Sequence, residues 1–213
     1  MKFLSFSQIF AIVGLLICLA GIGVQIRSIL NRPFKNDLSR PQGEVRRGIL
    51  YAFTLGMAPW EKESTKIHWI AYLRGIFLHI GIFIGLLVVI TIPWLSLIPV
   101  WLIYLISVIT GLGAIFGFIG IYMRLTGENE RVLSLPDDYV SIVLTSLFLI
   151  LTTLVLLIPG VLPYLYFLTA ILLIYIPLSK IRHCVYFFYS KFFFGRHFGH
   201  RGVIGQSESK YSK

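Results

Sequence analysis

The sequence is poor in charge. Only 13% of its 213 residues are charged, 57% are apolar, and the mean hydropathy is +0.84. Residues 80–123 and 139–179 contain no Lys, Arg, Asp or Glu. Uncharged runs of this length are typical of helices that cross a bilayer. The composition therefore excludes a soluble globular enzyme and a disordered chain, and two cysteines, Cys18 and Cys184, are too few for a disulfide scaffold.

The long apolar runs predict an all-α, polytopic membrane protein with one membrane domain over residues 1–213. A transmembrane helix needs about 20 apolar residues, and the runs lack the alternation of barrel strands. The expected helices span residues 3–25, 67–92, 100–122, 139–158 and 164–194. Residues 26–66 would form a cytoplasmic loop and 195–213 a cytoplasmic tail. The first helix is interpreted as a retained anchor, because its apolar stretch is long and its basic flank follows it.

The basic residues predict the orientation. Of 19 Lys and Arg, 17 fall in the 26–66 loop, in the 124–138 hairpin or toward the C-terminal end. Lys2 alone belongs to the opposite face, and Arg74 lies inside the second span. The positive-inside rule then places the N-terminus outside and the C-terminus inside a prokaryotic cell membrane. In this interpretation the net charge of +10 comes from basic residues gathered on the inner side of the membrane, and no nucleic-acid partner is expected.

The five histidines are His68, His79, His183, His197 and His200, all in the second and fifth predicted helices or at their inner ends. At 100° and 1.5 Å per residue, His68 and His79 share one helical stripe about 16 Å apart in depth. His183 and His197 come within about 40° of one another by the same geometry. Because the two helices are antiparallel, His79 is expected to face His183 deep in the membrane. His68 would face His197, or alternatively His200, at the inner surface.

Two stacked bis-histidine sites predict two haem b groups, since a planar haem takes one imidazole on each face. Carboxylate or thiolate ligands for zinc or a di-metal centre are missing near these histidines. A histidine that only packs near the interface is the alternative at each position. Close helix packing is expected at glycines of the second and third helices: Gly75, Gly81, Gly85, Gly111, Gly113, Gly117 and Gly120.

Arg74 is a candidate partner for a haem propionate. An unpaired charge inside a span is costly, and Arg74 lies between the two histidines of the second helix. Arg182 and Arg196 are further candidates. The alternative is that these side chains snorkel to the inner surface.

Two segments carry a resemblance to a known family. Residues 62–79, KESTKIHWIAYLRGIFLH, with residues 176–183, IPLSKIRH, resemble the cytochrome b (gamma) subunit of respiratory nitrate reductases. They resemble still more the membrane subunits of heterodisulfide-reductase-like and sulfate-reducer electron-transfer complexes. The resemblance covers nearly the whole chain and implies five helices, two stacked b haems and a quinone or quinol reacting near the outer haem.

The resemblance also implies ligands. His79 and His183 would hold the outer haem, and His68 and His197 the inner one. The nitrate reductase pattern places its last ligand closer to His200, whereas helical phase and depth favour His197, so both remain candidates. The family's quinone-contacting lysine has no counterpart in the outer half of this chain, and no quinone-site residue is predicted.

The predicted function is a diheme cytochrome b subunit, which carries electrons as part of an oxidoreductase complex and is not a stand-alone enzyme. Electrons would pass between the quinone pool and a peripheral iron-sulfur subunit, which the 26–66 loop and the basic tail could dock. An alternative partner is a periplasmic multihaem cytochrome c. A haem-free membrane anchor or a transporter is the alternative of another class, although a transporter would be expected to show broken helices or an internal repeat.

Overall fold

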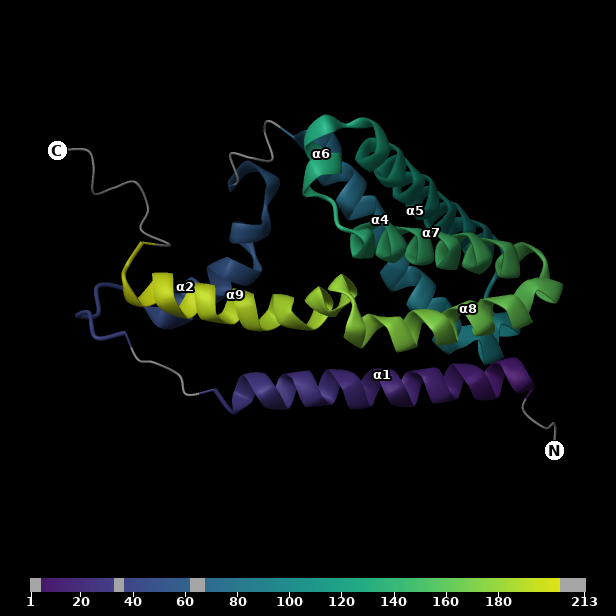
Figure 1. Cartoon of the computed structure of the whole chain (residues 1–213), viewed down its shortest axis with the longest axis horizontal. Helices are drawn as coiled ribbons and strands as arrows, with labels where there is room; N and C mark the ends of the chain where they lie inside the picture. The colour runs from purple at the N-terminus through teal and green to yellow at the C-terminus, as the bar shows by residue number, and fades with distance from the viewer. Residues whose placement is uncertain (1–4, 33–36, 62–67, 204–213) are drawn as a thin grey trace. The chain divides into compact units, whose positions relative to one another are not determined.

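The computed structural model describes residues 5–32, 37–61 and 68–203, and within them every regular element is a helix (Figure 1). The all-α prediction is confirmed. The α-helices are α1 (Phe6–Leu30), α2 (Val45–Phe53), α4 (Trp69–Thr91), α5 (Val100–Thr126), α6 (Glu128–Leu133), α7 (Pro136–Leu157), α8 (Leu162–Tyr175) and α9 (His183–His200).

Four helices, α1, α4, α5 and α7, are long and apolar enough to cross a membrane. The segments containing α8 and α9 meet the same criterion only when taken together, as one interrupted span. The described chain therefore has four spanning helices, or five if this pair crosses once. Long apolar helices of this number fit a multi-pass membrane protein.

The chain divides into two compact units, where the sequence predicts one membrane domain. The first unit comprises Met1–Val24 and Ile70–Ile181, and the second comprises Gln25–Trp69 and Arg182–Lys213. The first unit thus holds most of α1 together with the helices from α4 to α8. The second holds α2 and α9, which are joined to the first unit through the chain itself.

The core of the first unit lies where α5, α7 and α8 pack together. Phe148, Leu149 and Leu165 are fully buried there. Buried hydroxyls join α5 and α7. The Thr110 hydroxyl of α5 lies 2.8 Å from the Thr153 hydroxyl of α7, and it lies 3.0 Å from the Ile106 carbonyl of its own helix, to which it can donate.

Small residues set the spacing between helices of the first unit. A Cβ placed on Gly113 of α5 would lie only 3.1 Å from the Gly81 Cα of α4. A Cβ on Gly14 of α1 would lie 3.0 Å from the Ala170 Cα of α8. These separations confirm the predicted close packing at Gly81 and Gly113, since a larger side chain would push the backbones apart.

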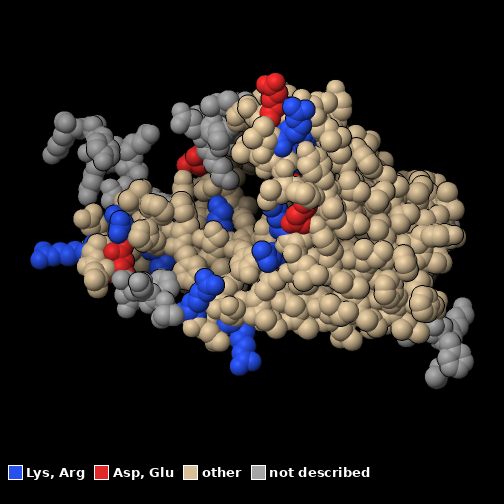
Figure 2. Space-filling view, viewed as in Figure 1, with Lys and Arg blue, Asp and Glu red and all other residues tan. Residues whose placement is uncertain are grey.

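The charged side chains of the first unit gather at one end, around the α5–α6–α7 hairpin. Arg124 and Arg131 belong to the hairpin itself, Arg74 reaches Met123 at the end of α5, and Lys180 bonds Asp138 at the start of α7. Figure 2 shows the opposite ends of α7 and α8 without charged side chains. The positive-inside rule takes such an end as the cytoplasmic one, and the orientation stays a prediction.

The second unit is built on a close crossing of α2 and α9. A Cβ on Gly48 would come within 2.5 Å of the Gly199 Cα, and one on Gly195 within 2.6 Å of the Ile49 Cα. Gly202, two residues after the end of α9, has a left-handed φ of 66°, and the Val203 N–H bonds the Phe198 carbonyl at 3.1 Å. This is the Schellman arrangement, in which glycine at the left-handed position ends the helix without strain.

Some boundaries differ from the sequence prediction. The continuous helix expected over 164–194 is wrong, because α8 ends at Tyr175 and two 3-10 turns, Ile176–Leu178 and Lys180–Arg182, precede α9. Pro177 lacks the N–H that would continue the helix. The expected tail begins too early, since α9 continues to His200, and the expected 26–66 loop contains helix α2.

Candidate functional site

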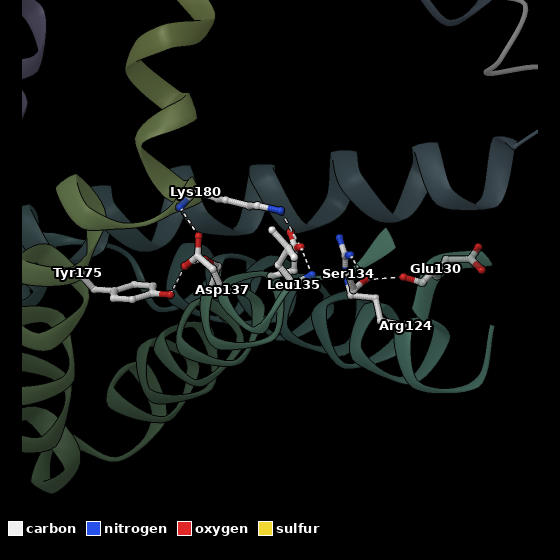
Figure 3. A network of polar contacts seen from close by, with 9 residues as sticks. Arg124, Glu130, Ser134, Leu135, Asp137, Tyr175 and Lys180 are labelled. Carbon is white, nitrogen blue, oxygen red and sulfur yellow. Dashed lines mark hydrogen bonds and ion pairs between the residues drawn. The ribbon is translucent and has the colours of Figure 1, made fainter. Parts of the chain in front are cut away.

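The interruption between α8 and α9 is held by carboxylates at the start of α7 (Figure 3). Asp137 accepts hydrogen bonds from the Tyr175 hydroxyl and from the Lys180 backbone N–H, the latter at 2.7 Å. Asp138 accepts from Lys180 Nζ at 2.7 Å and from the Leu135 N–H at 2.8 Å. The backbone N–H released by the break therefore finds an acceptor, which an interrupted span requires.

This interruption changes the setting of His183. The residue opens α9 as its first helical position and is exposed, whereas the sequence predicts it deep inside one long helix. The last residues before it, from Tyr175 to Lys180, lie beside the charged end of α7. The depth expected for His183 rested on the continuous helix and loses that support.

His79 lies at the middle of α4 and is exposed on the surface of the first unit. Its Nδ1 lies 2.6 Å from the Gly75 carbonyl oxygen, one turn earlier in the same helix. An imidazole whose Nδ1 is engaged by a backbone carbonyl coordinates a metal through Nε2. The α4 backbone thus holds the ring through Nδ1.

Gly75 leaves room beside that imidazole. No described atom lies within 4 Å of the position that a Cβ on Gly75 would take, in contrast to Gly81 in the next turns of the same helix. The predicted close packing is therefore absent at Gly75 among the described residues. A flat group bound at His79 would meet no side chain at this position.

Arg74 packs across α5. Its Nη1 lies 3.8 Å from Met123 Sδ, and a Cβ on Gly120 would come within 3.0 Å of the same nitrogen. Arg74 forms none of the ion pairs found among the described residues. Arg124 is near enough to repel Arg74 electrostatically and Glu130 is near enough to attract it, and the Nε of Arg124 is buried without a hydrogen-bond partner in the described chain. The two guanidinium groups could bind an anionic ligand in addition to Glu130.

His197 lies on α9 beside a carboxylate from the loop. Its Nδ1 is 3.4 Å from Asp37 Oδ2, the oxygen that also accepts from Arg201 Nε at 2.8 Å. The hydrogen bond from Arg201, with that from the Ser39 backbone, holds the pKa of the Asp37 carboxyl well below its usual range. Asp37 is therefore an ionised acceptor next to the histidine.

His200 is engaged differently. Its Nε2 lies 2.9 Å from the Ser39 carbonyl oxygen, and its own carbonyl accepts from the Gln42 and Gly43 N–H groups at 2.8 and 3.2 Å. Nε2 is the nitrogen at the tip of the ring, so this contact holds it against the loop. The two candidate ligands therefore differ in the ring nitrogen that faces the loop. It is Nδ1 in His197, next to Asp37, and Nε2 in His200, next to Ser39.

His68 lies just before the first residue of α4, so it is outside the helix whose phase was used to align it with His79. His68, His183, His197 and His200 belong to the second unit, and His79 and Arg74 belong to the first. The pairings of His79 with His183 and of His68 with His197 stay predictions. No cluster of three or more His, Cys, Asp or Glu suited to a metal occurs in the described ranges; a bis-histidine site has only two such ligands.

The sequence analysis missed Asp37 and Ser39. The Ser39 N–H donates to Asp37 Oδ1 at 3.0 Å, an Asx-type turn that the local sequence could have indicated. Their contacts with His197 and His200 join residues about 160 positions apart, 161 in the case of Ser39 and His200. No local pattern carries that information.

The chain was compared with family models, with curated proteins and with solved structures. None of the three comparisons finds a match.

Proposed function

We propose that this protein is a diheme cytochrome b subunit of a membrane oxidoreductase complex. Its histidines would hold two b haems, with His79 and His183 at one, which keeps the name outer haem from the sequence prediction, and His68 and His197 at the other, the inner haem. Electrons would move between the membrane quinone pool and a peripheral iron-sulfur subunit. Bound haem would supply the one-electron chemistry, and the protein would supply axial ligands, spacing and a low dielectric.

The observation that carries the proposal is the way two predicted ligands are held. His79 and His197 each have Nδ1 next to an oxygen acceptor, the Gly75 carbonyl at 2.6 Å and the Asp37 carboxylate at 3.4 Å. Metal-ligating histidines almost always engage their second ring nitrogen in this way. The proposed ligands are imidazoles, and no cluster of three or more His, Cys, Asp or Glu accompanies them in the described ranges, which suits haem better than zinc or calcium.

The surroundings of His79 support a flat, partly anionic ligand. Gly75 leaves open space one turn before the imidazole, and Arg74 has only a thioether as a hydrogen-bond acceptor among the described residues. A haem propionate is a carboxylate that Arg74 and Arg124 could bind. The macrocycle itself would lie against the apolar surface of α4.

The membrane topology supports the same proposal. We take the α8–α9 pair as the fifth span, with the α5–α6–α7 hairpin, the 26–66 loop and the C-terminal end on the cytoplasmic side. The N-terminus would then lie outside. The basic residues near α2 and at the end of α9 would face the cytoplasmic partner.

The test is a reduced-minus-oxidised optical spectrum of the purified full-length protein, with haem measured per chain. We expect a b-type α-band and two haems. Absence of the band would overturn the proposal, and one haem per chain would overturn the two-site assignment.

Histidine variants assign the sites. Replacing His79 or His183 by alanine should remove one haem, and His197→Ala should remove the other. His200→Ala is the matched control, since it lies one turn from His197 on the same helix and should keep both haems. If His200→Ala loses a haem and His197→Ala keeps two, the inner ligand is His200.

A further inference from the structure

The loop residue Asp37 lies at the centre of the contacts that close the end of α9. Its Oδ2 accepts from Arg201 Nε at 2.8 Å, and its Oδ1 accepts from the Ser39 N–H at 3.0 Å. His197 Nδ1 lies 3.4 Å from Oδ2. The carboxylate therefore accepts hydrogen bonds from one arginine and one backbone amide, and it lies within ion-pair distance of one predicted haem ligand.

The backbone of the loop fixes where this carboxylate stands. The Gln42 and Gly43 N–H groups both bond the His200 carbonyl, which is one of the orphan carbonyls at the end of α9. A Cβ on Gly43 would come within 2.5 Å of the Gly202 Cα, so the two segments are in direct contact. Asp37 is thus placed beside His197 by contacts that do not involve the imidazole.

We infer that Asp37 is a positioning residue for His197 as an axial ligand of the inner haem, an inference that rests on the proposed function. In the haem-bound protein the Asp37 carboxylate, which lies 3.4 Å from Nδ1, would accept Nδ1–H, and this would fix the tautomer and rotation of the ring and leave Nε2 for iron. It also makes the imidazole a more basic ligand, which stabilises ferric over ferrous iron and lowers the potential of that haem.

Arg201 opposes this effect. It binds the same oxygen, Oδ2, and its positive charge withdraws electron density from the acceptor that His197 uses. Arg201 also restrains the carboxylate in the loop. Asp37 and Arg201 therefore both hold the loop against the end of α9. Their charges shift the potential of the haem bound at His197 in opposite directions.

The experiment is a potentiometric titration of both haems in the full-length protein and in two variants. Asp37→Asn should keep two haems and raise the potential of the inner one by about 59 mV, which is a tenfold change for a one-electron couple. Arg201→Gln should leave that potential unchanged or lower it. The outer haem should titrate as in the wild type in both variants and serves as the internal reference.

The outcomes separate the two proposals. A wild-type protein without haem overturns both. Two haems in the wild type and one in His197→Ala, with an unchanged potential in Asp37→Asn, overturn the role of Asp37 alone. If Asp37→Asn and Arg201→Gln shift the potential in the same direction, or lose the haem equally, Asp37 only fastens the loop and the inference is wrong.

Discussion

Single charged or titratable side chains are informative about function in this protein because only 13% of its residues are charged. In the first unit, Arg74 is a guanidinium within a spanning helix, and Met123 Sδ, at 3.8 Å, is its described hydrogen-bond acceptor. A charged group in that position is costly unless an anion accompanies it. In the second unit, the contacts of His197 and His200 differ, although both rings leave the same helix.

Arg74→Gln should lower the potential of one haem. The substitution removes a positive charge next to the proposed propionate, and ferric haem, which carries one more positive charge than ferrous haem, is then favoured. A tenfold effect on the equilibrium would be about 59 mV. Potentiometric titration measures it.

The control is Arg131→Gln, which changes an exposed arginine on the hairpin helix α6. It should leave both potentials unchanged. Equal shifts in the two variants would point to a general surface-charge effect and would contradict a propionate at Arg74.

At the scale of elements, glycine and proline decide how the helices meet and where they stop. Pro177 and the acceptors Asp137 and Asp138 allow a break between α8 and α9. Gly48 and Gly199 allow α2 and α9 to touch through their backbones. Helix α2 was not expected from the sequence, and its stability comes from this crossing, since nine residues are too few for a stable isolated helix.

Gly48→Ala should destabilise the second unit by about 1–3 kcal/mol, because the added methyl group would meet the α9 backbone. A Cβ there would lie within 2.5 Å of the Gly199 Cα, a contact that only a shift of the helices could relieve. Thermal unfolding in detergent, together with protease cleavage of the segment that carries α2, measures the effect.

The matched variant is Gly23→Ala in α1, where no described atom lies within 4 Å of the new Cβ. It gains helix propensity without a clash and should be as stable as the wild type or more stable. Equal stability of the two alanine variants would show that α2 and α9 do not cross as closely as described.

At the scale of the whole molecule, the distribution of charge and the number of spans are linked. The charges of the first unit lie at one end of its helices, near the hairpin of α6. Whether the termini lie on the same or on opposite sides then depends on the α8–α9 pair, the interrupted segment that meets the criteria for a span only as a pair.

Reporter fusions test the topology. Green fluorescent protein at the C-terminus should fluoresce, because the C-terminus is expected inside. Alkaline phosphatase inserted at residue 160, between α7 and α8, should be active outside, and the same reporter at residue 127 should be inactive. An active phosphatase fusion at the C-terminus would show that the pair does not return the chain to the cytoplasm.

Much of the architecture follows from the sequence alone. The uncharged runs at 80–123 and 139–179 determine long apolar helices, because hydropathy acts over consecutive residues and needs no knowledge of distant contacts. The histidines on α4 and α9, and the gathering of basic residues near the helix ends, could be identified in the same way.

Tertiary structure decided the rest. The interruption after Tyr175 is stabilised by Asp137, 38 positions earlier in the chain, and the carboxylate beside the His197 ring belongs to Asp37, 160 positions earlier. Hydrogen bonds and ion pairs form between residues that folding brings together, and their partners leave no mark on local periodicity. Sequence could therefore name the candidate ligands, while only the folded chain determined which ring nitrogens of His79, His197 and His200 face an oxygen.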